Sequence, residues 1–273
     1  LFGTTDATTG AWVPVTYAGS YGTNGFFLPF TNATSTTTLG YDFSGMSNNW
    51  TCNNISLTAG GTYDSMTDVP TLTSATAANY CVINPLNMGT DATLSAANLT
   101  IAYGTATTRS AMQGTLGITS GKYYWEAVCT TSSVSPTVNM FMGIANRVMP
   151  SDVGSYPGNT AYGWGFNANG GDIYHSGSST LYGSPAAVND IIQVAFDADN
   201  GNLYFGINNV WQNSGNPLTG TNPAFSGLPS DTYFPSVGDG SATSSYTGSV
   251  NFGQRPFTYT PPTGYVALNT YNM

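Results

Sequence analysis

The chain has 273 residues and a formal net charge of -9, with 40% hydrophobic and only 6% charged residues. Four basic residues against 13 acidic ones argue against a nucleic-acid partner, because phosphate backbones are bound through clustered Lys and Arg. The hydrophobic content is ample for a packed core and argues against a disordered chain. No apolar run is long enough for a membrane span and no signal peptide is apparent, so we expect no membrane insertion.

The N-terminal part of the chain is rich in turn-forming and hydroxyl-bearing residues that interrupt every apolar pattern. Segments 25–30 and 55–57 are typical of short strands, whereas 34–38 and 67–76 are typical of extended connectors. Helical periodicity is nearly absent. We therefore expect a loop-rich, strand-containing assembly region at residues 1–90, a β-domain at 91–260 and a C-terminal tail at 261–273.

Short strands become clear from residue 121 onward. Apolar residues occupy every second position in segments 122–129, 138–145 and 162–166, and segments 172–175, 233–237 and 249–253 are predicted as further strands. Such strands, separated by Gly, Asn, Asp, Ser and Pro, are typical of an antiparallel sandwich or barrel. In the third segment, Tyr162, Trp164 and Phe166 share one face, with glycines between them.

Residues 191–208, IIQVAFDADNGNLYFGIN, predict a β-hairpin with a definite register. A two-residue Asn200-Gly201 turn is the strongest short-range hairpin signal, and it sets Val194, Phe196 and Ala198 opposite Ile207, Phe205 and Leu203. One face is then wholly apolar and the other carries polar residues, as in a strand pair with one buried face. A second turn at Asn208-Asn209 places Trp211 opposite Gly206.

A series of motifs extends this pattern over about half of the chain. In order they read GKYYWEAV (121–128), MFMGIAN (140–146), YGWGFNANG (162–170), DIIQVAFDADNGNLYFGINN (190–209), YFPSVGDG (233–240) and VNFGQRPF (250–257). This series resembles the SPRY (B30.2-like) domain. The resemblance implies an all-β fold, an antiparallel concanavalin-like β-sandwich of the jelly-roll type, which binds partners through loops at one end and is not an enzyme.

The flanking segments resemble a second group of proteins. YGTNGFFLPF (21–30), LGYDFSGMSNNWTCNNISLT (39–58), TYDSMTDVPT (62–71), NYCVINPLN (79–87) and the ending NFGQRPFTYTPPTGYVALNTYNM look like tail-fibre and other virion proteins of bacteriophages. The resemblance implies a structural protein of the virion, an extracellular particle assembled in the cytoplasm of the bacterial host. It also favours a homotrimer whose partners are other virion subunits and a host surface glycan or protein.

Three functions follow as hypotheses. The leading one is a non-enzymatic tail-fibre or receptor-binding component whose sandwich loops bind the host surface. The alternative is a capsid or fibre decoration module that binds other virion subunits. The third is a polysaccharide depolymerase, because concanavalin-like sandwiches include glycanases that use two carboxylates.

Catalytic and metal-binding patterns are weak in this sequence. Glu126 is the only Glu and has no acidic partner at i+2 or i+4, so hydrogen bonding to neighbouring backbone is the better interpretation. Asp197 and Asp199 have the spacing of a calcium loop without its final acidic ligand, and a hairpin turn explains them more simply. His175, the only histidine, is interpreted as a surface or edge residue.

The three cysteines, Cys52, Cys81 and Cys129, have no metal-ligand spacing and are predicted to be buried free thiols. Together with the weak acidic pattern, this spacing gives no reason to expect a metal or a cofactor.

Candidate binding residues come from loops that often form the partner surface of SPRY-like domains. Trp211 either covers Gly206 or stacks on a ligand. The loop that follows residue 146 and the loop before the last strand supply the other candidates, which are Arg147, Met149, Asp152, Tyr156, Asp239 and Tyr246. Aromatic rings beside Asp and Asn suit a sugar and suit a protein equally.

Overall fold

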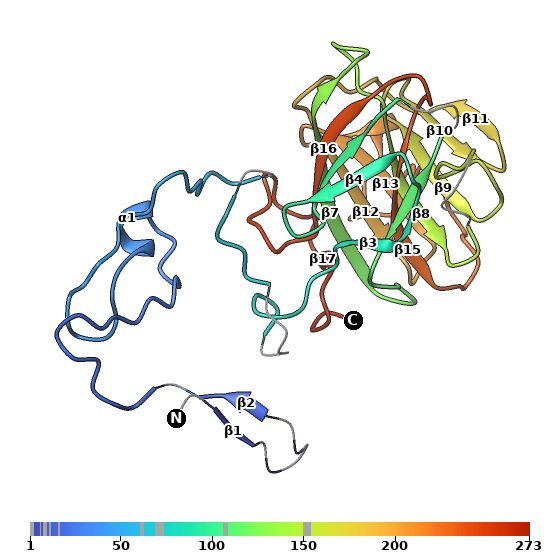
Figure 1. Cartoon of the computed structure of the whole chain (residues 1–273). Helices are drawn as coiled ribbons and strands as arrows, with labels where there is room; N and C mark the ends of the chain where they lie inside the picture. Colours follow the sequence, from blue (N-terminus) through green and yellow to red (C-terminus); the bar gives the residue numbers. More distant parts are fainter. Residues whose placement is uncertain are drawn as a thin grey trace. The chain divides into compact units, whose positions relative to one another are not determined.

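The computed structural model describes residues 3–5, 7, 10, 12–15, 17–60, 63–68, 74–105, 109–149 and 154–273. The chain divides into two compact units, Leu1–Leu57 and Thr58–Met273. In Figure 1 the first unit is drawn in blue and the second runs from blue-green to red.

The first unit is largely irregular, and segments 25–30 and 55–57 form no strands, so that expectation was wrong. Strands β1 (Gly3–Thr5) and β2 (Trp12–Pro14) pair antiparallel, and α1 (Thr36–Leu39) is a single helical turn. The expectation of an extended connector at 34–38 was therefore wrong. Ser35 and Thr38 form a capping box, in which each side chain accepts the backbone N–H of the other, and this stabilises the turn.

One carboxylate organises the loops of the first unit. Asp42 accepts hydrogen bonds from the backbone N–H groups of Phe27, Ser44 and Asn48 at 2.8 to 2.9 Å. Desolvation acts to raise the pKa of Asp42, but these hydrogen bonds outweigh it and lower the pKa to about 2. A charged group thus holds together a unit in which few side chains are buried.

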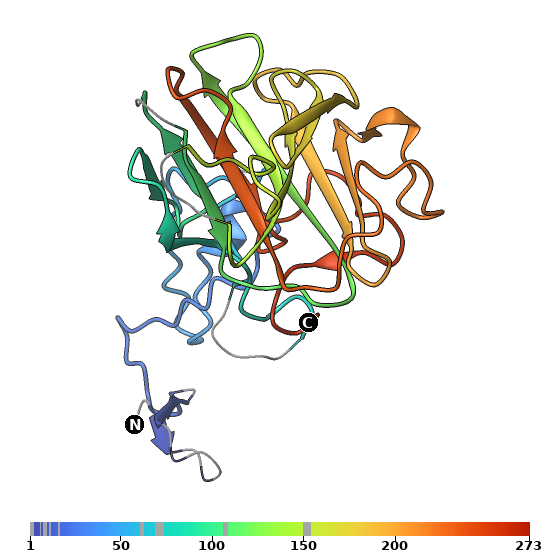
Figure 2. The same cartoon turned by 90° about the vertical axis from the view of Figure 1, so that its right-hand side faces the viewer.

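The second unit is an antiparallel β-sandwich, shown in two views in Figures 1 and 2. In the described part of the chain one sheet has seven strands in the order β11 (Ser178–Leu181), β10 (Asp172–His175), β9 (Gly163–Asn167), β8 (Met140–Asn146), β15 (Tyr233–Asp239), β6 (Ala111–Gly114) and β3 (Ile83–Met88). The other has the order β14 (Val210–Trp211), β13 (Asn202–Ile207), β12 (Ile191–Asp197), β7 (Lys122–Ser132), β16 (Tyr246–Asn251), β5 (Thr100–Tyr103) and β4 (Ala92–Ser95), and β17 (Val266–Ala267) pairs with β7. The fold class expected from the sequence is confirmed.

Alternating side chains of both sheets fill a single core. On β7 the inward positions carry Tyr123, Trp125, Ala127 and Cys129, all at most 3% exposed. The inward positions of β8 are equally buried, as the period-two pattern predicts. Cys81 and Cys129 are buried free thiols and Cys52 is half-buried. The unit includes β3 and β17, which lie outside the range 91–260 suggested by the sequence.

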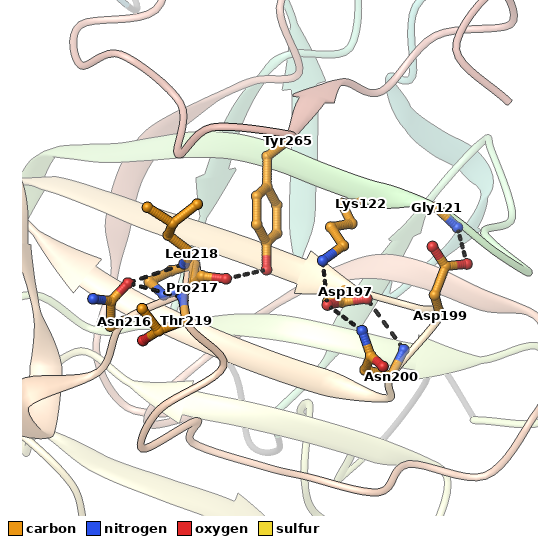
Figure 3. Close-up of polar contacts among 10 residues, drawn as sticks. All are labelled: Gly121, Lys122, Asp197, Asp199, Asn200, Asn216, Pro217, Leu218, Thr219 and Tyr265. Carbon is orange, nitrogen blue, oxygen red and sulfur yellow. Dashed lines mark hydrogen bonds and ion pairs between the residues drawn. The ribbon is translucent and has the colours of Figure 1, made fainter.

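The hairpin of β12 and β13 departs from its predicted register by two residues. The pairing ends at Asp197 opposite Asn202, so the loop has four residues, 198–201, and Val194 faces Phe205. Only Gly201 of the predicted two-residue turn has a positive φ, of 63°. Asp197 accepts hydrogen bonds from Asn200, and Asp199 accepts one from the backbone N–H of Gly121 (Figure 3). These bonds stabilise the longer loop, and a shift of two residues keeps every side chain on its predicted face.

The second face of the eight-stranded sheet is covered by the chain's C-terminal segment. Tyr124, Ala195 and Tyr204 are buried on this face beside Tyr265 and Phe257. The sequence predicted a solvent-facing surface here. The prediction was wrong because the covering residues lie far along the chain from the hairpin.

The two chain segments that border the sandwich lie side by side. Cys81 donates its backbone N–H to the carbonyl of Leu268, and Thr270 donates to the carbonyl of Asn79, both at 3.0 Å. An isolated bridge joins Tyr80 and Asn269 between them. The chain therefore enters and leaves the sandwich at the same place.

Candidate functional site

The loop that follows β8 supplies four of the predicted binding residues. Arg147 is exposed, whereas Met149 is 3% exposed and packs with Ala111 and Ala145. Asp152 lies outside the described residues. Tyr156 is 9% exposed. The loop therefore presents Arg147 and buries Met149 and most of Tyr156.

Tyr156 belongs to an aromatic cluster on the outer face of the seven-stranded sheet. Its ring lies 4.8 Å from that of Phe141 and 5.8 Å from that of Tyr174. The guanidinium of Arg109 lies 4.7 Å above its centre, within cation–π range. The loop thus packs on its own sheet, and Tyr156 has a structural role.

Asp239 and Tyr246 are buried at 0% and 2% exposure. Asp239 accepts a hydrogen bond from the backbone N–H of Ser110 at 2.9 Å. Burial raises the pKa of Asp239 to about 6, with a smaller contribution from the nearby carboxylate of Asp91. Tyr246 donates to the carbonyl of Gly238 and packs on Tyr103, with ring centres 5.0 Å apart. Both side chains belong to the interior of the sandwich.

Trp211 is half-buried and lies opposite Gly206, as the sequence predicts. Its indole would be 3.2 Å from a Cβ at position 206, so the ring covers the glycine. It also packs against the cluster that contains Tyr124 and Tyr265. The six candidates that the structure describes are therefore spread over both sheets and their loops. Binding of a partner by the accessible Arg147 and Trp211 stays a prediction.

The structure brings together a different set of residues at the end of the sandwich where β8 and β10 finish and β9 and β15 begin. A hollow of about 490 Å³ opens there between these strands of the seven-stranded sheet and the segment 225–231, and we call it the aromatic groove. It is lined by Asn146, Ala161, Tyr162, Trp164, His175, Phe225, Ser226, Gly227, Leu228, Pro229, Asp231 and Tyr233. Its volume is in the range of small-molecule and sugar sites.

Aromatic rings form one wall of the groove. The indole of Trp164, 8% exposed, stacks on the imidazole of His175 at 4.7 Å and meets Tyr233 edge-on at 5.4 Å. Phe225 lies 6.4 Å from His175, and Tyr162 at the rim is 43% exposed. Trp164 and Tyr233 belong to the main core, so the groove is the place where the core reaches the surface.

Polar groups also line the groove. The amide of Asn146 donates to the carboxylate of Asp231 at 2.9 Å. His175 Nδ1 lies 2.9 Å from the carbonyl oxygen of Gly163, which can only accept, so Nδ1 carries the proton. In the neutral ring Nε2 is then an acceptor. The groove thus offers aromatic faces together with a carboxylate, an amide and an imidazole.

The candidate acid of the sequence lies outside the aromatic groove. Glu126, the one candidate acid, accepts hydrogen bonds from the backbone N–H groups of Thr258 and Tyr259 and from the hydroxyl of Tyr124, each at 2.8 Å. The backbone role expected for Glu126 is confirmed. The described residues contain no group of three His, Cys, Asp or Glu side chains placed to hold a metal ion. Among them, no helix is long and apolar enough to cross a membrane.

The sequence did contain a signal for the groove. Tyr162 and Trp164 stand in the alternating YGWGF motif, and His175 is the only histidine of the chain. Pairing of β9 with β10 places Trp164 directly opposite His175. Phe225 and Asp231 lie in an irregular segment before β15. This segment has no hydrophobic periodicity from which their position could be predicted.

Comparison with known proteins agrees with this fold. Residues 122–255 match the family model of the SPRY domain, so the chain contains a SPRY domain. Among solved structures the chain is similar to the SPRY domain of human HERC1, with 17% sequence identity and a TM-score of 0.52 over 65% of this chain and 99% of that chain. At this identity the likeness shows the fold alone. No curated protein sequence matches the chain.

Proposed function

We propose that the protein is a non-enzymatic component of a bacteriophage virion, a tail-fibre or receptor-binding protein whose SPRY sandwich binds a host surface glycan or protein. The observation that carries the binding role is the aromatic groove, where Trp164, His175 and Tyr162 lie beside Asp231. Aromatic faces pack on apolar sugar faces or side chains, and the carboxylate accepts from hydroxyl or amide groups. The virion assignment is supported by the flanking segments that resemble phage proteins.

A second candidate, a module that docks on other virion subunits, is supported by the first unit. Phe26, Phe27, Phe43 and Trp50 are 40 to 55% exposed there. A hollow of about 590 Å³ is lined mainly by apolar and aromatic side chains, Val15, Tyr17, Ser20, Tyr21, Gly25, Phe26 and Phe27. Apolar surface of this kind marks interaction sites. In this second proposal the apolar surface of the first unit docks on other virion subunits.

The test of receptor binding uses an array of bacterial surface polysaccharides probed with the full chain. We expect binding that Tyr162→Ala and Asp231→Asn each weaken at least fivefold, because both side chains reach the groove surface. Tyr271→Ala is the matched control, since Tyr271 is 51% exposed and lines no part of the groove. Equal binding by all three variants would place recognition elsewhere.

The position of the chain is tested by cryo-electron microscopy of an intact particle. A position at the distal end of a fibre supports receptor binding, and a position on the capsid or fibre shaft supports decoration. Absence from the particle overturns the virion assignment and leaves the groove test unaffected.

A further inference from the structure

A second hollow lies on the outer face of the eight-stranded sheet, and we call it the polar pocket. It measures about 480 Å³ and is lined by Lys122, Asp197, Asn200, Asn202, Pro217, Leu218, Thr219 and Gly220. The pocket borders the β12–β13 loop through Asn200. The aromatic groove borders the same loop, because Leu228 of the groove donates its N–H to the carbonyl of Gly201. None of its residues lines the groove.

The floor of the polar pocket is a fixed set of polar groups. Lys122 and Asp197 are directly opposed on β7 and β12, and Lys122 Nζ lies 2.9 Å from Asp197 Oδ2 (Figure 3). Asn200 donates its side-chain amide to the same oxygen at 2.8 Å and its backbone N–H to Oδ1 at 3.1 Å. Burial acts to raise the pKa of Asp197, but these bonds and the ammonium outweigh it and lower the pKa. The carboxylate is therefore ionised and held in place at neutral pH.

The rim of the pocket is a loop whose shape is set by its own hydrogen bonds. Asn216 Oδ1 accepts the backbone N–H groups of Leu218 and Thr219, and the Asn216 carbonyl accepts that of Gly220. The hydroxyl of Tyr265 donates to the carbonyl of Pro217 at 3.4 Å (Figure 3). A site built on strands and a braced loop loses little entropy when it binds a ligand.

Hydrogen-bonding capacity remains unused in this pocket. The ammonium group of Lys122 has three N–H donors. Among the described contacts it has one hydrogen-bond acceptor, the carboxylate of Asp197. The side-chain amide of Asn202, half-buried on β13, makes no hydrogen bond with any described residue. Donors and acceptors therefore stand side by side, and the paired charges of Lys122 and Asp197 cancel.

We propose that the polar pocket binds one residue of a neutral saccharide through its hydroxyl groups. A hydroxyl both donates and accepts, so adjacent hydroxyls of a sugar can donate to Asp197 or Asn202 and accept from Lys122. The charge balance disfavours an anionic ligand, which would meet the Asp197 carboxylate. This inference goes beyond the proposed function, because it concerns a separate site and holds whether or not the aromatic groove binds a receptor.

The chain offers a direct reporter, since Lys122 is its only lysine. Full-length protein labelled with ¹³C-lysine gives one side-chain signal, which is titrated with the methyl glycosides of glucose, galactose and mannose. We expect at least one of them to shift this signal in a saturable way. Asn202→Ala and Thr219→Val are expected to weaken that binding at least threefold, and the control Thr180→Val, on the exposed strand β11, leaves it unchanged.

Three results would overturn the proposal. They are the absence of a saturable shift with all three glycosides, an unchanged affinity in the folded Asn202→Ala protein, and a shift caused only by the charged methyl glucuronide. Tyr162→Ala in the groove is expected to leave the lysine titration unchanged. A failed array test with a positive lysine titration therefore rejects the groove alone, and the reverse result rejects the polar pocket alone.

Discussion

The imidazole of His175 stacks on the indole of Trp164 with ring centres 4.7 Å apart and planes inclined by 12°. The two residues are paired across β10 and β9, so the pleat of the sheet sets the stack. The hydrogen bond from Nδ1 to the Gly163 carbonyl fixes the plane of the imidazole. His175 therefore positions the indole that forms the wall of the aromatic groove.

Substitution of His175 separates stacking from hydrogen bonding. His175→Ala removes both and is expected to lower the free energy of unfolding by about 2 kcal/mol. His175→Phe keeps an aromatic ring against Trp164 and is expected to lose roughly half as much. Urea denaturation measures both variants, and equal losses would show that the stack contributes nothing.

The buried carboxyl of Asp239 is expected to make stability depend on pH. Its pKa is about 6 in the folded protein against an ordinary value of 3.8, so between these values the folded state binds the proton more tightly than the unfolded state. Stability from this group is therefore present below about pH 4 and is lost as pH rises to about 6. Asp91 and Arg109 also face this group.

The substitution Asp239→Asn keeps an oxygen acceptor for the Ser110 N–H and removes the titration. We expect the variant to melt higher than the wild type at neutral pH and to lose this advantage toward pH 4. Thermal melts across this range measure the difference. Parallel profiles for the two proteins would disprove the linkage.

Trp211 is expected to stabilise the eight-stranded sheet. Trp211→Ala uncovers Gly206 and the cluster around Tyr124, and should cost about 2 kcal/mol of unfolding free energy. The neighbouring Val210 is 64% exposed, so Val210→Ala is a matched control with an expected change within about 0.5 kcal/mol. An unchanged midpoint of urea denaturation for Trp211→Ala would show that the indole does not stabilise the sheet. Trp211 would then again be a candidate ligand contact.

Glu126 connects β7 to the C-terminal segment. In Glu126→Gln an amide N–H₂ faces a backbone N–H of Thr258 or Tyr259, so two donors are left without an acceptor. We expect this to lower the free energy of unfolding by about 2 kcal/mol. Chemical denaturation measures this loss. Polysaccharide chain length after incubation should stay the same with either protein; shortening by the wild type alone would support a depolymerase.

The strands of the sandwich could be predicted because each carries its own period. The alternation of Tyr123 and Trp125 with Tyr124 and Glu126 identifies β7 without reference to the rest of the chain. The strands before residue 120 were missed because they are short, with four residues each in β4, β5 and β6, so that a local pair such as β4 and β5 shows little alternation. The loop length at 198–201 depends on the Asp199 bond to Gly121, a contact between distant residues.

The candidate sites were harder to predict than the strands. Loop membership suggested Met149 and Tyr156 as binding residues, but both pack on the sheet below them. The aromatic groove arises from four strand ends and one irregular segment that converge only in the folded chain. The polar pocket combines Lys122 with residues that follow it by about 75 to 100 positions, and no local motif joins them.

The meeting of residues 79–81 with 268–270 has a mechanical consequence. A pull applied between these two segments, as on a fibre in flow, acts first on the few backbone hydrogen bonds that join them. The sheets lie outside that line of force, so the sandwich is spared shear until the junction opens. A load carried along the chain can thus bypass the sandwich instead of unravelling it.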